Sequence, residues 1–210
     1  MKRVLLAALL FAPLSVWAET AGQDPFTQGS AEAGAAKAAV CAACHGPGGN
    51  SSNPAWPKLA AQGSSYIYAQ LKQFKSGARV NALMAGQVAA LSDDDMRNLA
   101  AYFAAQPASP GVASESAVAH AQPLYRGGDA ARGVPACAAC HTPTGTGVEA
   151  AAYPRIGGQH ADYVAVRLKA YRDAAATDLP DGNFKVMAGV AAKLTDDDIA
   201  ALASYVNGLQ

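Results

Sequence analysis

Apolar side chains recur at helical spacing in two matching stretches of the chain. Three in each stretch follow the spacing i, i+4, i+7: Ile67, Leu71 and Phe74 in the first, and Val164, Leu168 and Tyr171 in the second. This spacing places the three side chains on one face of a helix. Ser65 and Asp162 stand near the starts of the two stretches and are the predicted N-cap residues. The pattern therefore predicts one amphipathic helix in each stretch.

A second pair of helices is predicted near the end of each half of the sequence. Their apolar positions are Met96, Leu99 and Phe103 in one half, and Ile199, Leu202 and Val206 in the other. Ser92 and Thr195 are candidate N-caps, and three aspartates follow each of them. Negative side chains favour the positive end of a helix macrodipole. Both halves are thus predicted to close with a helix.

The chain is a tandem repeat, because the same order of segments runs through both halves. The pentapeptide CAACH begins at Cys41 and again at Cys137, an offset of 96 residues. Met84-Ala85-Gly86 returns as Met187-Ala188-Gly189 at an offset of 103, after an insertion at 177–183. The alternation of apolar and polar residues that is typical of strands is nearly absent. We therefore expect an all-α protein of two small domains.

A stretch rich in proline, serine and glycine separates the two copies. It runs from Gln106 to Gly111 and would stop the first closing helix. We place an N-terminal domain at 19–106, a linker at 107–115 and a C-terminal domain at 116–210. Small domains bury a modest core, and the many alanines remove little apolar area from water. A large apolar cofactor in each copy would supply the missing buried surface.

The first 18 residues have the features of a secretory signal peptide. Two basic residues precede an apolar run over residues 4–12, and small residues ending at Ala18 form a predicted cleavage site. A membrane anchor is the alternative, but the apolar run is well short of the roughly 20 residues that span a bilayer. We expect cleavage of residues 1–18 and export of the mature protein.

The mature chain is close to electrically neutral. Cleavage would remove Lys2 and Arg3 and leave 14 basic against 16 acidic side chains. No basic stripe indicates nucleic-acid binding, and no long charge run indicates a disordered tail. Any electrostatic steering of a partner must therefore come from local patches.

Each CAACH pentapeptide is a C-x-x-C-H motif, which is typical of covalent haem attachment. Positions i and i+3 of a helical turn share one face, so the two thiols can bond the two vinyl groups of one porphyrin. The histidine that follows can then bind the iron from one side. We expect thioether bonds at Cys41, Cys44, Cys137 and Cys140, with His45 and His141 as the proximal iron ligands.

A redox disulfide and a zinc site are the alternative interpretations of a C-x-x-C pair. A thioredoxin-like disulfide lies in a βαβ context, which this sequence lacks. A zinc site leaves unexplained both the adjoining histidines and the wide separation of the two motifs. We therefore prefer two covalently attached haem c groups.

Two methionines are candidates for the second axial ligand of each iron. A histidine and methionine pair raises the potential of cytochromes c and suits electron transfer. Met84 and Met187 are duplicated, and we expect both in loop-like segments between two helices. Met96 is replaced by Ile199 in the other copy, so we assign Met96 to the core. The alternative for Met84 and Met187 is that they only fill gaps in a core.

Pro57 and Pro154 occupy equivalent places in the two copies, each between an aromatic and a basic residue. A ligand histidine usually donates its second ring N–H to a nearby acceptor, which fixes the ring and raises its basicity. We predict hydrogen bonds from His45 to the Pro57 carbonyl and from His141 to the Pro154 carbonyl. The alternative is that each proline only stiffens a loop.

His120 and His160 are histidines without a counterpart in the other copy. Either could in principle complete a bis-histidine site or serve an enzyme. Unpaired histidines usually have no ligand role, so we expect both at the surface or at an interface.

The ordered motifs resemble those of the dihaem cytochromes c4, in which two class I cytochrome c folds are joined in one chain. The likeness covers nearly all of the mature sequence and rests on the two CAACH motifs, the Met-Ala-Gly segments and Pro57-Lys58-Leu59. It implies two domains related by a pseudo-twofold axis, with the haems close together. It also implies a monomeric periplasmic carrier between a quinol-oxidising cytochrome bc complex and a terminal oxidase.

Some members of this family are similar to subunits of larger enzymes or lie at the membrane face, so peripheral membrane association stays open. The second copy has a shorter run from Gly133 to Cys137, with Pro135 inserted, and a longer loop before Met187. Equal potentials for the two haems are therefore not implied.

Two other classes of function remain as alternatives. A dihaem peroxidase or a sulfur-compound dehydrogenase needs an iron position that a substrate can reach, and two matched methionines argue against it. An electron-entry subunit held permanently by a flavin or molybdenum enzyme would need the same residues as a free carrier. The sequence barely separates this last class from the carrier.

Overall fold

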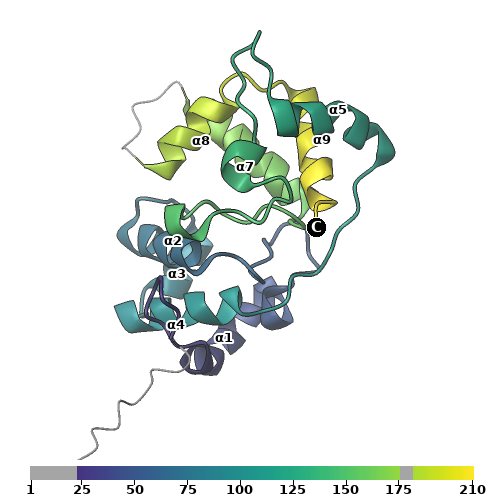
Figure 1. Cartoon of the computed structure of the whole chain (residues 1–210). Helices are drawn as coiled ribbons and strands as arrows, with labels where there is room; N and C mark the ends of the chain where they lie inside the picture. The colour runs from purple at the N-terminus through teal and green to yellow at the C-terminus, as the bar shows by residue number, and fades with distance from the viewer. Residues whose placement is uncertain (1–22, 176–181) are drawn as a thin grey trace, which may run out of the picture.

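The computed structural model describes residues 23–175 and 182–210, which form an all-α protein in two halves (Figure 1). The expected signal peptide, 1–18, and most of the insertion at 177–183 lie outside these residues. Within them, β pairing is limited to three isolated bridges, so no strand forms. None of the helices in these ranges is long and apolar enough to cross a membrane.

The first half is built around the crossing of its first and last helices. Its elements are α1 (Ala31–His45), η1 (Pro47–Gly49), α2 (Ser64–Ser76), α3 (Ala82–Val88) and α4 (Asp93–Ala104). Helix α1 packs against α4, and α2 packs against both α3 and α4. Gly34 permits the crossing, because a Cβ atom at this position would lie 2.0 Å from the carbonyl oxygen of Asn98.

The second half repeats this arrangement with one break. Its elements are α5 (Glu115–Gly127), α6 (Ala138–His141), η2 (Glu149–Ala151), α7 (Ala161–Ala174), α8 (Asn183–Ala191) and α9 (Asp196–Asn207). Helix α5 packs on α9, and α7 packs on α8 and α9. Helices α5 and α6 together correspond to α1. They are separated because Gly128 adopts a φ of +69° and Pro135 lacks the N–H that a continuous helix needs.

Each half has its own hydrophobic core. The main cluster of buried residues in the first is Ala38, Ile67, Leu99, Ala100 and Phe103. Those of the second are Ala121, Leu124, Tyr125, Val134, Ala191, Leu194, Ile199, Leu202, Tyr205 and Val206. The side chain of Met96 is also buried, which confirms its assignment to the core. The cluster around Leu99 has five buried residues and two of them are alanine, which agrees with the need for a large apolar group in that half.

The predicted caps of the two closing helices are confirmed. Ser92 accepts from the backbone N–H of Asp95, and Thr195 accepts from that of Asp198, each at 3.1 Å. The Asp95 and Asp198 carboxylates accept in return from the backbone N–H of Ser92 and Thr195, so both ends are complete capping boxes.

The predicted caps of the other two helices are wrong. Helix α2 starts at Ser64 after Gly63, and α7 starts at Ala161 after His160, so Ser65 and Asp162 lie inside the first turn. The N-terminus of α2 is capped from the other half of the molecule instead. A carboxylate oxygen of Glu149 accepts from the Ser65 backbone N–H at 2.6 Å. Capping patterns involve only residues that are close in sequence, so they could not predict this contact between distant segments.

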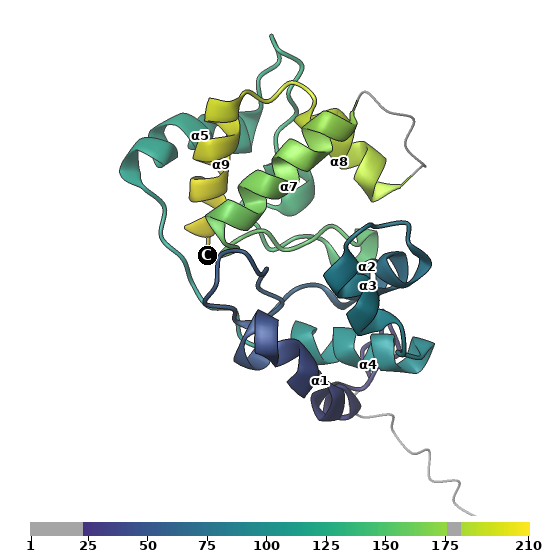
Figure 2. The ribbon, with the colours of Figure 1, turned by 180° about the vertical axis from the view of Figure 1, so that it is seen from behind.

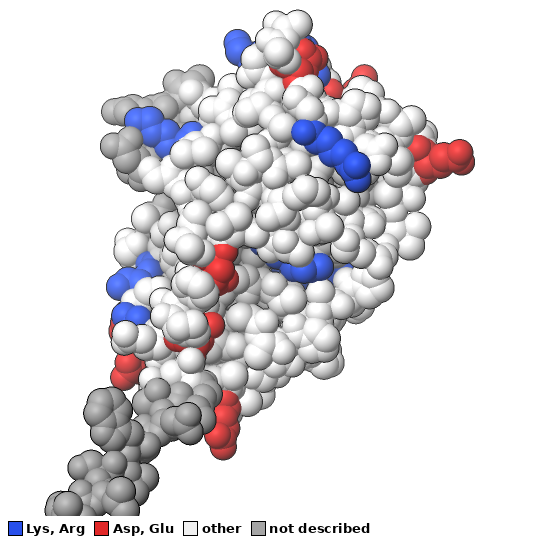
Figure 3. All heavy atoms as spheres, viewed as in Figure 1, with Lys and Arg blue, Asp and Glu red and all other residues white. Residues whose placement is uncertain are grey.

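The two halves lie one against the other, and the segment between α4 and α5 passes along one side of both (Figures 1 and 2). The C-terminus lies at their boundary. On the face drawn in Figure 3, charged side chains are scattered, with broad uncharged areas between them. This face therefore shows no basic stripe.

Candidate haem-binding sites

The two CAACH segments place their cysteines and histidines alike. In the first half the segment forms the last turn of α1, and in the second it begins just before α6 and continues through it. Both histidines point into the protein: His45 is 7% exposed and His141 is 5% exposed. The cysteines, all of them in the described part of the chain, are not joined in disulfides.

Each of these histidines makes the hydrogen bond that the sequence predicts. His45 Nδ1 lies 2.8 Å from the Pro57 carbonyl oxygen, and His141 Nδ1 lies 2.9 Å from that of Pro154. A carbonyl can only accept, so Nδ1 carries the proton in both rings. The lone pair of Nε2 is then free for a metal ion.

Burial tunes the acidity of both kinds of side chain in the motif. It lowers the pKa of His45 and of His141, against the smaller opposing effect of the proline carbonyls. Both rings are therefore neutral at neutral pH, the form that binds a metal. Burial raises the pKa of the Cys41 thiol, and that of Cys137 to about 11. A raised pKa is the opposite of what a reactive redox thiol needs, and this argues against the disulfide alternative.

A zinc site also finds no support in the geometry. The residues that the structure describes contain no group of three or more histidine, cysteine, aspartate or glutamate side chains able to hold a metal ion. Structural zinc requires four such ligands.

The two methionines lie on short helices and not in the loops that the sequence suggested. Met84 lies in α3 and Met187 lies in α8, and both side chains are half-buried. The side chain of Asn81 starts α3 by accepting from the backbone N–H of Met84 at 3.0 Å. The expectation of loops failed because α3 is only two turns long and its cap, Asn81, was not recognised.

An open cavity of about 630 Å³ lies in the second half, next to its CAACH motif. Small and apolar residues line it: Gly127, Ala130, Gly133, Val134, Pro135, Val186, Gly189 and Val190. Val134 and Pro135 lie in the loop before the motif, from which Ala136 separates them, and Val186 is the neighbour of Met187. The cavity therefore lies between the loop that precedes the CAACH segment and the methionine helix α8. Its size and its apolar lining suit a cofactor.

Arg167 supplies a second sign of a bound group. Its Nε is buried, and it is the one buried side-chain polar atom in the described ranges that has no hydrogen-bond partner. Its guanidinium lies over the ring of Tyr171, 4.9 Å from the centroid. A buried N–H of arginine calls for an acceptor, and a carboxylate is the best match. Haem carries two carboxylates, so the residues present fit this cofactor.

The two unpaired histidines lie at the surface and at the boundary between the halves, as expected. His120 is exposed, and its Nε2 lies 3.0 Å from an oxygen of Asp198. His160 lies at the boundary between the halves, where its Nε2 contacts the Ser51 carbonyl oxygen at 2.8 Å.

Tyr125 is a supporting residue that the sequence analysis missed. It is fully buried, and its hydroxyl donates to the Thr142 carbonyl at 2.7 Å. Thr142 directly follows His141 and has a φ of +69°, a conformation that favours glycine. The hydrogen bond holds this strained residue in place. No repeated partner marks Tyr125, so the repeat pattern could not reveal it.

Each half is a helical domain with a C-x-x-C-H turn near its start and a methionine helix before its closing helix. Two such domains in one chain define a two-domain c-type cytochrome. The sequence matches the Cytochrome c family at residues 31–106 and 128–210. Cytochrome c4 of Pseudomonas aeruginosa is 46% identical over 209 residues, which cover all of both chains. The chain belongs to the cytochrome c4 family, and its two domains carry two covalently attached haem c groups.

Two further comparisons bear on structure and function. The crystal structure of reduced recombinant cytochrome c4 from Pseudomonas stutzeri has a TM-score of 0.81 and 44% identity. The structural match covers 87% of this chain and 100% of the cytochrome c4 chain, and it confirms the fold. A thiosulfate dehydrogenase electron acceptor of Stutzerimonas stutzeri is 38% identical, over 95% of this chain and 90% of its own.

Proposed function

We propose that this cytochrome carries electrons with two six-coordinate haems, and that it is not itself an enzyme. The axial pairs are His45 with Met84, and His141 with Met187. The haem iron supplies the one-electron redox chemistry when bound. The observation that carries the proposal is that the set of two cysteines, a histidine and a methionine occurs twice. In both copies the Nδ1–H of the histidine donates to a proline carbonyl.

The protein groups have separate tasks in this scheme. The four cysteines of the motifs hold the porphyrins, and the proline carbonyls orient the imidazoles. The thioethers of Met84 and Met187 close the second axial position, so that no substrate reaches the iron. Electrons then enter and leave at the haem edges. We also propose the domain limits 19–106 and 116–210, joined by 107–115.

We propose a periplasmic location and a place between a quinol-oxidising cytochrome bc complex and a terminal oxidase. A cleavable signal at 1–18 would export the chain. We also propose that the carrier is a monomer, free or at the membrane face. Nearly balanced charge leaves docking to local patches.

The second candidate is an electron acceptor that serves one enzyme. A thiosulfate dehydrogenase electron acceptor aligns with almost the whole chain, which favours this alternative over a peroxidase. In this case the same two haems would receive electrons from a sulfur-oxidising partner and pass them on.

Stopped-flow kinetics with the purified dihaem protein separates the two candidates. We expect quinol with a cytochrome bc complex to reduce both haems, and a terminal oxidase to reoxidise them. A second-order rate constant of about 10⁶ M⁻¹ s⁻¹ or more is expected for a physiological partner. Fast reduction only by thiosulfate with its dehydrogenase would support the second candidate. Rapid turnover of peroxide by the cytochrome alone would contradict both.

A further inference from the structure

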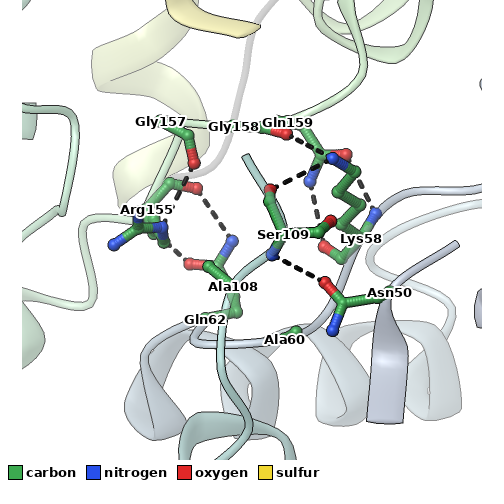
Figure 4. Close-up of a pocket in the computed structure, with 10 residues that line it drawn as sticks. All are labelled: Asn50, Lys58, Ala60, Gln62, Ala108, Ser109, Arg155, Gly157, Gly158 and Gln159. Carbon is green, nitrogen blue, oxygen red and sulfur yellow. Dashed lines mark hydrogen bonds between the residues drawn. The ribbon is translucent and has the colours of Figure 1, made fainter. Parts of the chain in front are cut away.

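Two glutamines join the halves of the molecule through a reciprocal pair of contacts (Figure 4). The side chain of Gln62 accepts from the Arg155 backbone N–H at 2.7 Å and donates to the Arg155 carbonyl at 2.9 Å. Gln159 accepts from the Lys58 backbone N–H and donates to the Lys58 carbonyl, both at 2.9 Å. Both glutamines are buried, with 6% and 8% of their surface exposed. Each half thus holds one residue of the other by both of its backbone groups.

The residue that Gln159 holds is directly connected to the histidine of the first motif. The N–H of Lys58 belongs to the peptide group whose oxygen is the Pro57 carbonyl. That oxygen accepts from His45 Nδ1 at 2.8 Å. One planar peptide group therefore contacts His45 at its oxygen and Gln159 of the other half at its nitrogen.

Gln62 has the same relationship with the second motif. The N–H of Arg155 belongs to the peptide group whose oxygen is the Pro154 carbonyl, and this oxygen accepts from His141 Nδ1 at 2.9 Å. The contact of Gln62 with Arg155 is thus equivalent to that of Gln159 with Lys58, with the roles of the two halves interchanged. Each histidine is thus tied, through one peptide group, to a glutamine of the opposite half.

We propose that Gln159 and Gln62 are positioning residues that set the reduction potential of the haem in the opposite half. The proposal rests on the proximal ligands assigned above. A peptide whose N–H is hydrogen-bonded has a more negative carbonyl oxygen, because linked hydrogen bonds polarise one another. A stronger acceptor at Nδ1 makes the imidazole more basic. A more basic ligand stabilises ferric over ferrous iron and lowers the potential.

The test compares Gln159→Leu with Gln62→Leu and measures the potential of each haem. Spectroelectrochemistry gives the potentials, and NMR of the reduced and oxidised protein assigns them to a haem. Gln159→Leu is expected to favour the reduced form of the first-half haem about threefold, or ~28 mV for one electron. It should leave the second haem unchanged, and Gln62→Leu should do the reverse.

His160→Leu is the matched control. It removes a contact of 2.8 Å across the same boundary, to the Ser51 carbonyl, which belongs to neither histidine-holding peptide. We expect it to leave both potentials unchanged. Should either leucine variant not fold, Gln159→Asn and Gln62→Asn retain the amide with a shorter reach, and we expect the same crossed shifts.

Three results would overturn the role of the glutamines. The potentials of both haems could shift together, the potential could shift in the half that carries the substitution, or His160→Leu could give shifts of the same size. The spectrum of the wild-type protein distinguishes a failure of this proposal from a failure of the proposed function. A wild type without histidine and methionine ligation overturns the ligand assignment and the glutamine role together. Intact wild-type ligation with uncrossed shifts overturns the glutamine role alone.

Discussion

The carboxylate of Asp198 lies 2.6 Å from Nη1 of Arg132 and is almost completely buried at the start of α9. It also receives hydrogen bonds from the Thr195 backbone and from His120. One aspartate therefore joins the last helix, the loop before the second CAACH motif and helix α5. Its counterpart Asp95 has, among the residues that the structure describes, one partner outside its own cap, Lys37, and is more exposed.

This network predicts that the second half is sensitive to acid. Burial works to raise the pKa of Asp198, but the hydrogen bonds from Arg132, Thr195 and His120 outweigh it, and the pKa lies well below its usual range. A depressed carboxyl pKa contributes stability that is present above the unfolded value of about 4 and is lost as the pH falls toward the folded value. We expect the free energy of unfolding to decrease from pH 5 to pH 2.

Asp198→Asn tests this dependence. At pH 7 it should cost about 2 kcal/mol, because hydrogen bonds to a charged group are lost, and it should flatten the acid limb of the stability curve. Asp95→Asn is the control. Its hydrogen bond from Lys37 holds the pKa of Asp95 at about 2, but this carboxylate is less buried than that of Asp198, so we expect a smaller loss. Denaturant unfolding at a series of pH values measures both. Equal losses in the two variants would contradict the special role of Asp198.

Gly34→Val should destabilise the first half, because the crossing of α1 and α4 leaves no space for a side chain at this position. The added Cβ would meet the Asn98 carbonyl at 2.0 Å, and moving the helices apart should cost about 3 kcal/mol or more. Ala35→Val adds the same side chain one residue later on the exposed face of α1, where only helix propensity changes, by at most ~0.7 kcal/mol. Calorimetry of both variants measures the difference, and similar melting temperatures would count against the tight crossing.

Tyr125→Phe should weaken the support of the second CAACH motif while keeping its shape. The variant leaves the Thr142 carbonyl without its donor, which should cost about 1–2 kcal/mol. Tyr102→Phe is the control, since the side chain of Tyr102 packs edge-on against Phe103 in the first half. We expect the second haem alone to lose its native iron ligation at a lower denaturant concentration in Tyr125→Phe, which absorption spectra follow during unfolding. An unchanged midpoint for the loss of ligation in this variant would show that Thr142 does not need the hydrogen bond.

The repeated parts of the fold and of the sites follow from local sequence. Helical spacing identified the faces that carry Ile67 and Leu99, and the capping residues Ser92 and Thr195 mark real helix starts. The duplicated His-Pro pairs were also predictable, because a ligand histidine needs an acceptor and the segment of an aromatic residue, proline and a basic residue recurs in both copies. These features depend on residues that are close in sequence or present twice.

What could not be predicted depends on contacts between distant segments. The capping of α2 by Glu149 and the pairing of Gln62 with Arg155 arise only when the two halves dock. Asp95 and Asp198 occupy equivalent positions in the sequence, and only their burial in the folded protein shows which of them contributes more to stability. The placement of Met84 and Met187 on helices was missed because two-turn helices give a weak periodic signal.

Haem ligation in Met84→Ala and Met187→Ala tests the central claim most directly, with Met96→Leu as the control for a buried methionine. Absorption spectra and potentials of each haem are the measurement. We expect each alanine variant to lose methionine ligation and to lower the potential at one haem only, while Met96→Leu leaves both haems as in the wild type. Wild-type spectra at both haems in either alanine variant would contradict the assignment of that methionine as an iron ligand.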